Sequence, residues 1–301
     1  MTDLEFRTDM DFAYAEPREI APGVQRIVAN NPSVFTFKGT NTYIIGTRDL
    51  AIIDPGPEDD AHFEAMIKTV GDRTVTHILI THTHRDHVDG LKRIAAATGA
   101  KVCGYGRNAD NRGALDAGPK STEYIDASFN PDITLRDGDA IAGEGWTLTS
   151  LFTPGHAPDH LCFALAEQRL LFSGDHVMGW NTTVVAPPEG SMSAYMKSLE
   201  KLIGRDETVF FPGHGGRITD PQRMVRGYMV HRNWREQAIL GAIRDGRRTI
   251  TDVVDLVYKG LDERLVNAAR LSVQAHVDHL IEKGLVTCDG PTTFTSELSA
   301  V

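Results

Sequence analysis

Residues 81–90 place three histidines and an aspartate within six positions of one another. They follow an apolar run, residues 77–80, that is typical of a buried parallel strand, and they precede residues 88–98, which have helical composition. In α/β folds the functional sites lie at the carboxyl ends of the strands. Neutral imidazole and carboxylate are both suitable ligands for zinc. The segment therefore predicts a metal site at a strand end, in an α/β fold.

The spacing within this cluster suggests two adjacent metal ions. His82 and His84 are two residues apart, so an extended backbone points both side chains the same way. Asp86 and His87 come after the chain has turned, and they need not serve the same ion.

A similar pattern recurs along residues 1–219: an apolar strand ends, often with a glycine, at a side chain that can bind metal. Glycine lets the backbone turn tightly and present that side chain. The strand tips carry Asp54, His82, His84, His156, Asp175 and His214. Because these tips belong to separate strands, their convergence would build a site that no single stretch could make.

The pattern of apolar runs and turn signals predicts alternating strands and helices. We expect strands at residues 24–28, 34–37, 42–45, 51–53, 77–80, 101–105, 133–135, 146–152, 160–165, 169–172 and 208–211, and helices at residues 58–70, 88–98 and 193–203. Residues 106–128 read as a long surface excursion of the kind that often forms a lid or substrate loop.

The C-terminal part reads as a second unit. Asp220 and Pro221 form a helix-start signal, and helical patterns follow at residues 251–258 and 264–283. Two short strands, residues 285–287 and 292–294, flank a glycine turn, and helices followed by a small hairpin suggest a winged helix. We therefore divide the chain into a catalytic domain, residues 1–219, and a helical linker with a winged-helix-like domain, residues 220–301.

Charge and composition exclude several classes of protein. The formal net charge is −10 over 301 residues, and residues 220–301 carry 11 basic and 11 acidic side chains, so the excess acid lies in residues 1–219. Strong non-specific nucleic-acid binding needs a basic surface. The acidic N-terminus shows no apolar signal region, so we expect no export, and no apolar run is long enough to span a membrane. The three cysteines are far apart, which fits reduced residues of a cytoplasmic protein.

The motif His82-x-His84-x-Asp86-His87, followed by Pro-Gly-His156, Ser-Gly-Asp175 and Pro-Gly-His214-Gly, resembles that of the metallo-β-lactamase-fold hydrolases. This resemblance covers about residues 20–219 and implies a four-layered αββα sandwich. It also implies two zinc ions, with manganese and iron left open, and a hydroxide shared between them as the nucleophile. It assigns the ligands as follows: His82, His84 and His156 to one ion, Asp86, His87 and His214 to the other, and Asp175 to both.

The resemblance also implies roles for three acidic residues in catalysis. Asp175 bridges the ions, and Asp54 orients the ligands. The proton of the leaving group returns either from metal-bound water or from Asp86, and the sequence leaves that choice open. We expect His176, which adjoins Asp175, to form a supporting hydrogen bond.

The chain is more specifically similar to the lactamase-beta-like-2 group, through residues 39–43, 84–87, 174–180 and 191–196 and through its C-terminal extension. That group contains an endoribonuclease for single-stranded RNA and has fungal relatives that act as polyketide thioesterases. The expected substrate is therefore an ester or thioester, or a phosphodiester such as single-stranded RNA. The residues expected to line the substrate cleft are Asn41, Tyr43, His160, Trp180, Asn181 and Thr182.

Other functions remain as alternatives at this stage. A β-lactamase-like or glyoxalase-II-like thioesterase would act on a small metabolite. A redox member of the superfamily would use iron and need an electron-transfer partner domain. A DNA-binding winged helix is disfavoured because residues 220–301 carry no net charge. The oligomeric state is open, a homodimer included, and we expect no membrane partner.

Overall fold

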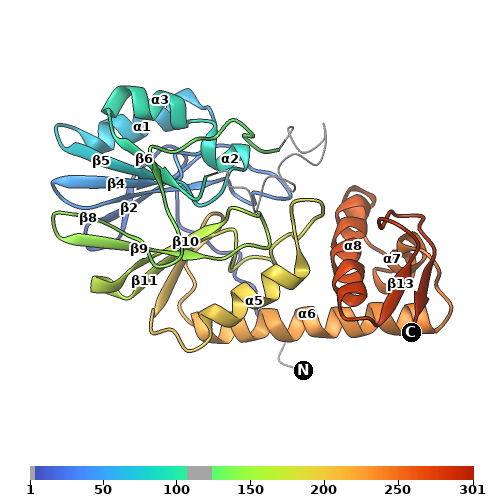
Figure 1. Ribbon diagram of the computed structural model, residues 1–301. Coiled ribbons are helices and arrows are strands. Elements are labelled where there is room, and N and C mark those ends of the chain that lie inside the picture. Colours follow the sequence, from blue (N-terminus) through green and yellow to red (C-terminus); the bar gives the residue numbers. More distant parts are fainter. Residues whose placement is uncertain (1–3, 107–123) are drawn as a thin grey trace.

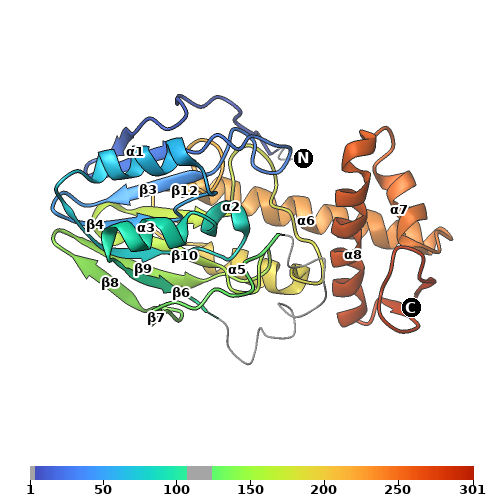
Figure 2. The same ribbon diagram turned by 90° about the horizontal axis from the view of Figure 1, so that it is seen from above.

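The computed structural model describes residues 4–106 and 124–301, and its architecture is shown in Figure 1. The long excursion predicted at residues 106–128 falls largely on residues 107–123, which lie outside the described residues. Within the described part, the chain forms two large β-sheets, flanking helices and a smaller C-terminal unit (Figures 1 and 2).

The first sheet contains seven strands in sequence order, β1 to β7. Strands β1 to β4 pair antiparallel, whereas β4, β5, β6 and β7 pair parallel. The strands are β1 Arg18–Ala21, β2 Val24–Val28, β3 Asn41–Ile45, β4 Asp49–Ile53, β5 Thr74–Leu79, β6 Lys101–Gly104 and β7 Ile133–Thr134. The parallel pairing of β5 confirms the buried strand predicted before the histidine cluster.

The second sheet has five strands in the order β12-β11-β10-β9-β8. Within this sheet only the β11–β12 pair is parallel. The strands are β8 Ala140–Gly143, β9 Trp146–Phe152, β10 Leu161–Leu165, β11 Leu170–Gly174 and β12 Val209–Pro212, with a short 3₁₀ turn, η2 Ala166–Gln168, between β10 and β11. Strand β8 is not among the predicted strands.

The two sheets pack face to face and helices cover both outer faces, as Figure 1 shows. Apolar side chains such as Phe163, Phe172 and Phe211 fill the space between the sheets. A second apolar cluster lies under α1 Asp60–Val70 and α3 Leu91–Thr98, and a third lies between the second sheet and α5 Met192–Leu202 and α6 Pro221–Arg244. This is the expected four-layered αββα sandwich.

Side-chain caps explain where several helices begin. The Asp59 carboxylate accepts the backbone N–H of His62 at the start of α1, and the Ser191 hydroxyl accepts that of Ala194 at the start of α5. At the start of α6, Asp220 is the cap, and the first helical residue is Pro221, which has no N–H that would need a partner.

Two local predictions for residues 1–219 were wrong. Residues 34–38 form a turn and no strand, because the Ser33 hydroxyl accepts the N–H groups of Phe35 and Thr36 and Phe37 has a left-handed φ of 55°. The single helix expected at residues 88–98 is divided into α2 Arg85–Val88 and α3. The break falls at Gly90, where a Cβ would lie only 3.0 Å from the carbonyl oxygen of Pro55.

The C-terminal unit has its own apolar core and contains the winged helix. Its elements are α7 Ile250–Val257, η3 Glu263–Leu265, α8 Val266–Glu282, β13 Val286–Cys288 and β14 Leu298–Ala300. The second wing strand is β14 and not residues 292–294, because the carbonyl groups there accept hydrogen bonds from Gln274 and Thr251 instead. Helix α6 runs from beneath the sandwich into this unit (Figure 1).

A division of the chain between residues 219 and 220 stays a prediction, since α6 packs on both units. In the described part of the chain, no helix combines the length and the apolar character that crossing a membrane requires.

Candidate metal centre

The predicted ligands all lie just beyond strand ends, on the same edge of the sandwich. His82 and His84 follow β5, with extended backbone at His84, and Asp86 and His87 lie in the first turn of α2. His156 follows β9, Asp175 follows β11 and His214 follows β12. Separate strands of both sheets therefore supply one cluster.

One group of donor atoms consists of three imidazole nitrogens. Nδ1 of His84 lies 2.9 Å from Nε2 of His82 and 3.0 Å from Nε2 of His156. Ligands that surround a tetrahedral ion at about 2.0–2.1 Å are separated by about 3.3 Å. The three nitrogens are thus close to the spacing that one ion would impose on them.

The second group is built around a carboxylate. Oδ2 of Asp86 lies 3.4 Å from Nε2 of His87 and 3.2 Å from Nε2 of His214. These three side chains also form a set with metal-ligand spacing.

Asp175 lies between the two groups. Its Oδ2 is 3.6 Å from Nε2 of His156, in the first group, and 3.3 Å from Nε2 of His214, in the second. Its Oδ1 is 3.6 Å from Nε2 of His87. One carboxylate therefore faces both groups, which is the arrangement expected of a ligand shared by two ions.

The outer nitrogens of the imidazoles show which tautomer each ring adopts. Nδ1 of His156 lies 2.6 Å from the carbonyl oxygen of Val184, and Nδ1 of His214 lies 3.2 Å from that of Gly39. A carbonyl can only accept, so each Nδ1 carries the proton and donates it. The Nε2 atoms of both rings are then the ones that face the site.

Asp54 also places a proton on Nδ1 of two other rings, those of His82 and His87. Its Oδ2 lies 2.8 Å from Nδ1 of His87 and accepts the hydroxyl of Thr81 at 2.7 Å. Because the Thr81 proton is directed to Asp54, its oxygen accepts from Nδ1 of His82, 3.0 Å away. Both rings are thereby held with Nε2 facing inward. These contacts are what the orienting role implied by the resemblance requires, and the role itself stays a prediction.

The donor set fits metal ions better than it fits a metal-free hydrogen-bond network. With the Nε2 atoms of His82 and His156 both acting as lone pairs, the single Nδ1 of His84 can satisfy at most one of them by donating a proton. Nε2 of His87, in the second group, and Oδ1 of Asp175, between the groups, are buried without a hydrogen-bond partner among the described residues. Buried polar atoms without partners are costly, and cations would satisfy both sets.

The two groups differ in protonation before metal binds. Burial and the neighbouring imidazole of His84 lower the pKa of His156 to about 4. Burial and the surrounding imidazoles also hold the pKa of His82 well below its ordinary value. Burial disfavours charge on His214 as well, but the carboxylates of Asp175 and Asp86 outweigh it and raise its pKa to about 9. His82 and His156 therefore offer free lone pairs near neutral pH, whereas His214 holds a proton where an ion would bind.

The residues expected to line the substrate cleft have different surroundings. Asn41 is buried and its amide donates to the carbonyl oxygens of Pro212 and Gly215. The Tyr43 hydroxyl donates to Pro212 as well. His160 is fully buried, and its Nε2 accepts the backbone N–H of Asp175 at 3.1 Å. These three side chains hold the backbone next to ligands, and contact of any of them with substrate stays a prediction.

The other three substrate candidates lie on the loop after β11. Trp180 stacks on Phe37 with ring centroids 4.8 Å apart. Asn181 is exposed and Thr182 is half-buried. The carbonyl oxygen of Asn181 accepts the hydroxyl of Tyr228 on α6, so the linker helix holds this loop. Contact of these residues with substrate also stays a prediction.

His176, which adjoins Asp175, is fully buried, and burial lowers its pKa to about 3. Its ring packs edge-on against Tyr195 with centroids 5.0 Å apart, and the Tyr195 hydroxyl donates to the His176 carbonyl oxygen. The imidazole is therefore a neutral part of the packing next to Asp175. Neither ring nitrogen has a hydrogen-bond partner among the described residues, so the supporting hydrogen bond expected from His176 is not formed.

One acidic residue at the site was not predicted. Oε2 of Glu189 lies 3.4 Å from Nε2 of His84, and the Glu189 side chain is 12% exposed. Glu189 belongs to the loop before α5 and follows two prolines, Pro187 and Pro188. No strand-end pattern marks it in the sequence.

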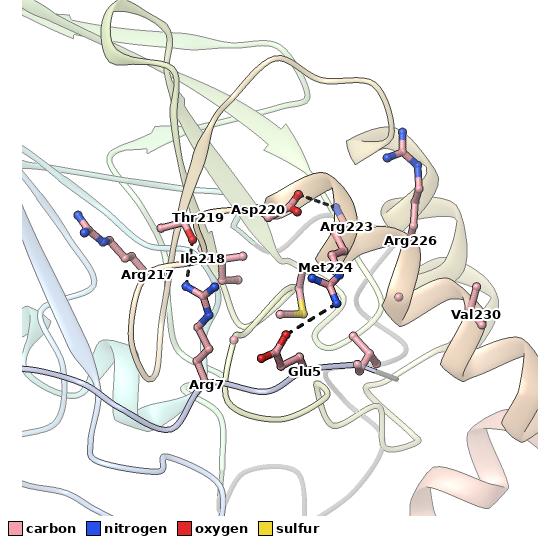
Figure 3. A pocket seen from close by; sticks show the side chains of 13 residues that line it. Glu5, Arg7, Arg217, Ile218, Thr219, Asp220, Arg223, Met224, Arg226 and Val230 are labelled. Carbon is pink, nitrogen blue, oxygen red and sulfur yellow. Dashed lines mark hydrogen bonds and ion pairs between the residues drawn. The ribbon is translucent and has the colours of Figure 1, made fainter. Parts of the chain in front are cut away.

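The arginines of α6 do not form one anion site. Arg223 and Arg226 border a hollow of about 410 Å³ between the N-terminal segment and α6, together with Arg7 and Arg217 (Figure 3). Arg7 donates to Thr219 and Arg223 pairs with Glu5. Arg232, by contrast, is buried and donates to the Thr183 carbonyl oxygen, and Arg235 packs over Tyr258. Arg223 and Arg226 thus share one hollow, whereas Arg232 and Arg235 make separate contacts farther along the helix.

Comparisons with known proteins agree with this geometry. Residues 35–214 match the family model described as the metallo-beta-lactamase superfamily. The chain belongs to the metallo-β-lactamase superfamily. Residues 249–291 match the beta-lactamase associated winged helix domain, a module named for its association with this superfamily. Both matches confirm the resemblance drawn from the motifs, and the hydrolase class that it implies.

Individual members of the superfamily are similar to this chain over most of its length. The Drosophila melanogaster protein named beta-lactamase-like protein 2 homolog is 35% identical over 88% of this chain and 90% of its own length. An atrochrysone carboxyl ACP thioesterase of Aspergillus chevalieri is 31% identical over 82% of this chain and 76% of its own. The crystal structure of a metallo-beta-lactamase family protein from Thermus thermophilus superposes with a TM-score of 0.75 at 25% identity, covering 94% of this chain and 100% of that one. The first of these names confirms the resemblance to the lactamase-beta-like-2 group.

Proposed function

We propose that this metallo-β-lactamase superfamily hydrolase is a zinc-dependent hydrolase of acyl thioesters that holds two metal ions. Its first ion would be held by His82, His84 and His156, its second by Asp86, His87 and His214, with Asp175 shared. The observation that carries the metal assignment is the convergence of these donor atoms in two groups joined by Asp175. All-nitrogen and mixed nitrogen–oxygen donors suit zinc, and the same donors are compatible with iron or manganese.

The proposed substrate class is supported by two observations. A thioesterase is among the relatives that align over most of this chain. The net charge of −10 disfavours RNA, whose binding depends on neutralising phosphates.

Bound metal ions supply a nucleophilic water near neutral pH and stabilise negative charge on an acyl oxygen. The protein's own groups position them. Asp86 is the most solvent-accessible carboxylate of the site, with 28% of its side chain exposed, against 9% for Asp175. Burial opposes ionisation of Asp86, but the imidazoles of His87 and His214 outweigh it and lower its pKa, so it is a carboxylate at neutral pH.

An ionised Asp86 can accept a proton from the water that attacks the thioester carbonyl. A carbon–oxygen bond then forms and the carbon–sulfur bond breaks, and the sulfur leaves with the bonding electrons as a thiolate. Thiols have a pKa of about 8.5, so a thiolate can leave near neutral pH without being protonated first. This chemistry needs no acidic side chain at the leaving group, which is the further reason for preferring thioesters to phosphodiesters.

The test is a substrate panel with a matched inactive variant. Zinc-loaded protein and Asp175→Asn are incubated with acyl thioesters of coenzyme A, and thiol release is followed with a disulfide dye. Parallel arms use labelled single-stranded RNA and a chromogenic β-lactam. We expect thiol release by the wild type alone. Cleavage of RNA or of the lactam, with no thiol release, would contradict the substrate class, and equal activity in Asp175→Asn would contradict the metal site.

A further inference from the structure

Glu189 lies in a loop whose backbone is held in place by hydrogen bonds and close packing. The Gly190 N–H donates to the carbonyl oxygen of Ala186 at 2.8 Å, and a Cβ at Gly190 would lie 2.3 Å from the backbone nitrogen of Ala186. The Ser191 N–H donates to Gly155, next to His156, and the Ser191 side chain caps α5. Glu189 is therefore held in a tight loop that is fixed at both ends.

With Glu189 in contact with His84, each of the five histidines of the site has an acceptor for its outer ring nitrogen. His87 donates its outer N–H to Asp54, His82 to Thr81, His156 to Val184 and His214 to Gly39. His84 differs because its Nδ1 faces the donor group and its Nε2 faces outward. Glu189 is the acceptor that lies opposite this Nε2, at 3.4 Å.

Among the described residues, Glu189 is the acidic side chain that lies within 4 Å of Nε2 of His84. Asp159 is 3% exposed and hydrogen-bonds the side chain of Thr83. Glu189 has its carboxylate toward the ring edge that bears the outer nitrogen. At 3.4 Å the contact is long for a hydrogen bond. An ion on Nδ1 would make the imidazole a stronger donor, which favours a shorter contact.

We propose, on the basis of the function proposed above, that Glu189 is a positioning residue for the first metal ion. Its carboxylate accepts the Nε2–H of His84, fixes the tautomer, and holds the Nδ1 lone pair toward the ion shared with His82 and His156. Without this acceptor the proton could move to Nδ1, and the ring could turn away from the site.

The loop that carries Glu189 also lies beside the C-terminal unit that contains the winged helix. Val184, near its beginning, accepts the Nδ1–H of His156, so the loop supports two of the three ligands of the first ion. Its outer side, at Pro187, Pro188 and Gly190, borders a cavity of about 640 Å³ whose other wall includes α8 residues. The loop is thus a wall between the metal centre and the C-terminal unit.

Metal binding tests the proposal without any substrate. Metal-free wild type, Glu189→Ala, Glu189→Gln and Glu200→Ala are titrated with Zn²⁺ against a chromogenic chelator. Glu200 is exposed on α5 and serves as the matched control. In Glu189→Ala the affinity for one of the two ions should fall by about 10- to 100-fold, as is usual when a ligand loses its hydrogen-bond partner. The affinity for the other ion should stay as in Glu200→Ala.

Glu189→Gln keeps an acceptor oxygen but loses the charge, and it should lie between Glu189→Ala and the control. Co²⁺ absorption spectra of the same proteins should change in one of two sets of bands, which a general loss of stability would not produce. If circular dichroism shows Glu189→Ala to be unfolded, Glu189→Gln decides the matter. Two ions bound by the folded Glu189 variants as tightly as by Glu200→Ala would overturn the proposal. A wild type that binds no metal would instead refute the proposed function itself.

Discussion

Oδ2 of Asp54 lies 2.8 Å from Nδ1 of His87, and the structure buries both side chains almost completely. Asp54 also accepts the N–H and the hydroxyl of Thr81, which in turn accepts from His82. A single carboxylate at the end of β4 thereby orients one imidazole from each donor group.

Replacing Asp54 by asparagine should therefore weaken both metal sites while preserving the fold. Asparagine has the same shape and tolerates the left-handed φ of 52° at this position. It lacks the charge that holds the proton on Nδ1, so zinc affinity should fall by about 10- to 100-fold. Zinc titration against a chelator measures this, with Asp72→Asn, at an exposed position, as the control. Unchanged zinc affinity in Asp54→Asn would refute this role.

The pH dependence of metal binding should distinguish the two groups. The pKa of about 9 for His214 means that this ring is protonated at pH 7 in the metal-free protein, whereas His156, with a pKa of about 4, is already neutral. Only neutral imidazole binds metal. Raising the pH from 6 to 9 should strengthen the second ion's binding by about tenfold per pH unit for each proton displaced, with little effect on the first ion. Calorimetric titrations in buffers of different ionisation enthalpy count those protons. Equal proton release on binding each ion would contradict the assignment.

Glu236 should attach the winged helix to the linker helix. It is 6% exposed on α6, and its carboxylate lies 2.7 Å from Nδ1 of His279 and 2.6 Å from Nζ of Lys283 at the end of α8. Glu236→Gln should lower the free energy of unfolding by about 1–3 kcal/mol, because hydrogen bonds to charged groups are lost. Urea denaturation at neutral pH measures the difference, with Glu282→Gln at the exposed end of α8 as the control.

The effect of Glu236→Gln on the free energy of unfolding should depend on pH in a defined direction. Burial raises the pKa of Glu236, but its contacts with His276, Lys283 and His279 outweigh burial and lower the pKa to about 2, below an ordinary value of 4.5. A lowered pKa stabilises the folded state above pH 4.5, and this stabilisation is lost as the pH falls toward 2. The gap between wild type and Glu236→Gln should narrow over this range. A gap that stays constant from pH 5 to pH 3 would contradict the ion pair.

The clustering of the proposed ligands could be predicted from the sequence because they follow apolar strands within short motifs. His156, Asp175 and His214 all obey this rule. Glu189 could not be predicted in this way, because it meets His84 across 105 residues of chain and its loop carries no strand-end signal. The strand assigned to residues 34–37 failed for a related reason, since the Ser33 hydroxyl takes the backbone N–H groups that a strand would have paired.

Burial distinguishes two kinds of residue near the proposed ligands. Some are packed inside the protein, and others are exposed enough to contact substrate. Tyr43 is 2% exposed and its hydroxyl donates to Pro212 at 2.6 Å, whereas Trp180 lies on the loop that reaches the surface at Asn181. Tyr43→Phe should leave KM unchanged and lower the free energy of unfolding by about 0.5–1.5 kcal/mol, the usual value of one hydrogen bond. Tyr124→Phe, at an exposed position, is the control.

Trp180→Ala, unlike Tyr43→Phe, should raise KM for a thioester substrate. Removing the indole deprives Phe37 of its stacking partner and opens the loop that follows Asp175. Steady-state kinetics and urea denaturation of both variants separate the two effects. A raised KM in Tyr43→Phe together with wild-type kinetics in Trp180→Ala would show that the substrate approaches from the β3 side of the metal centre instead.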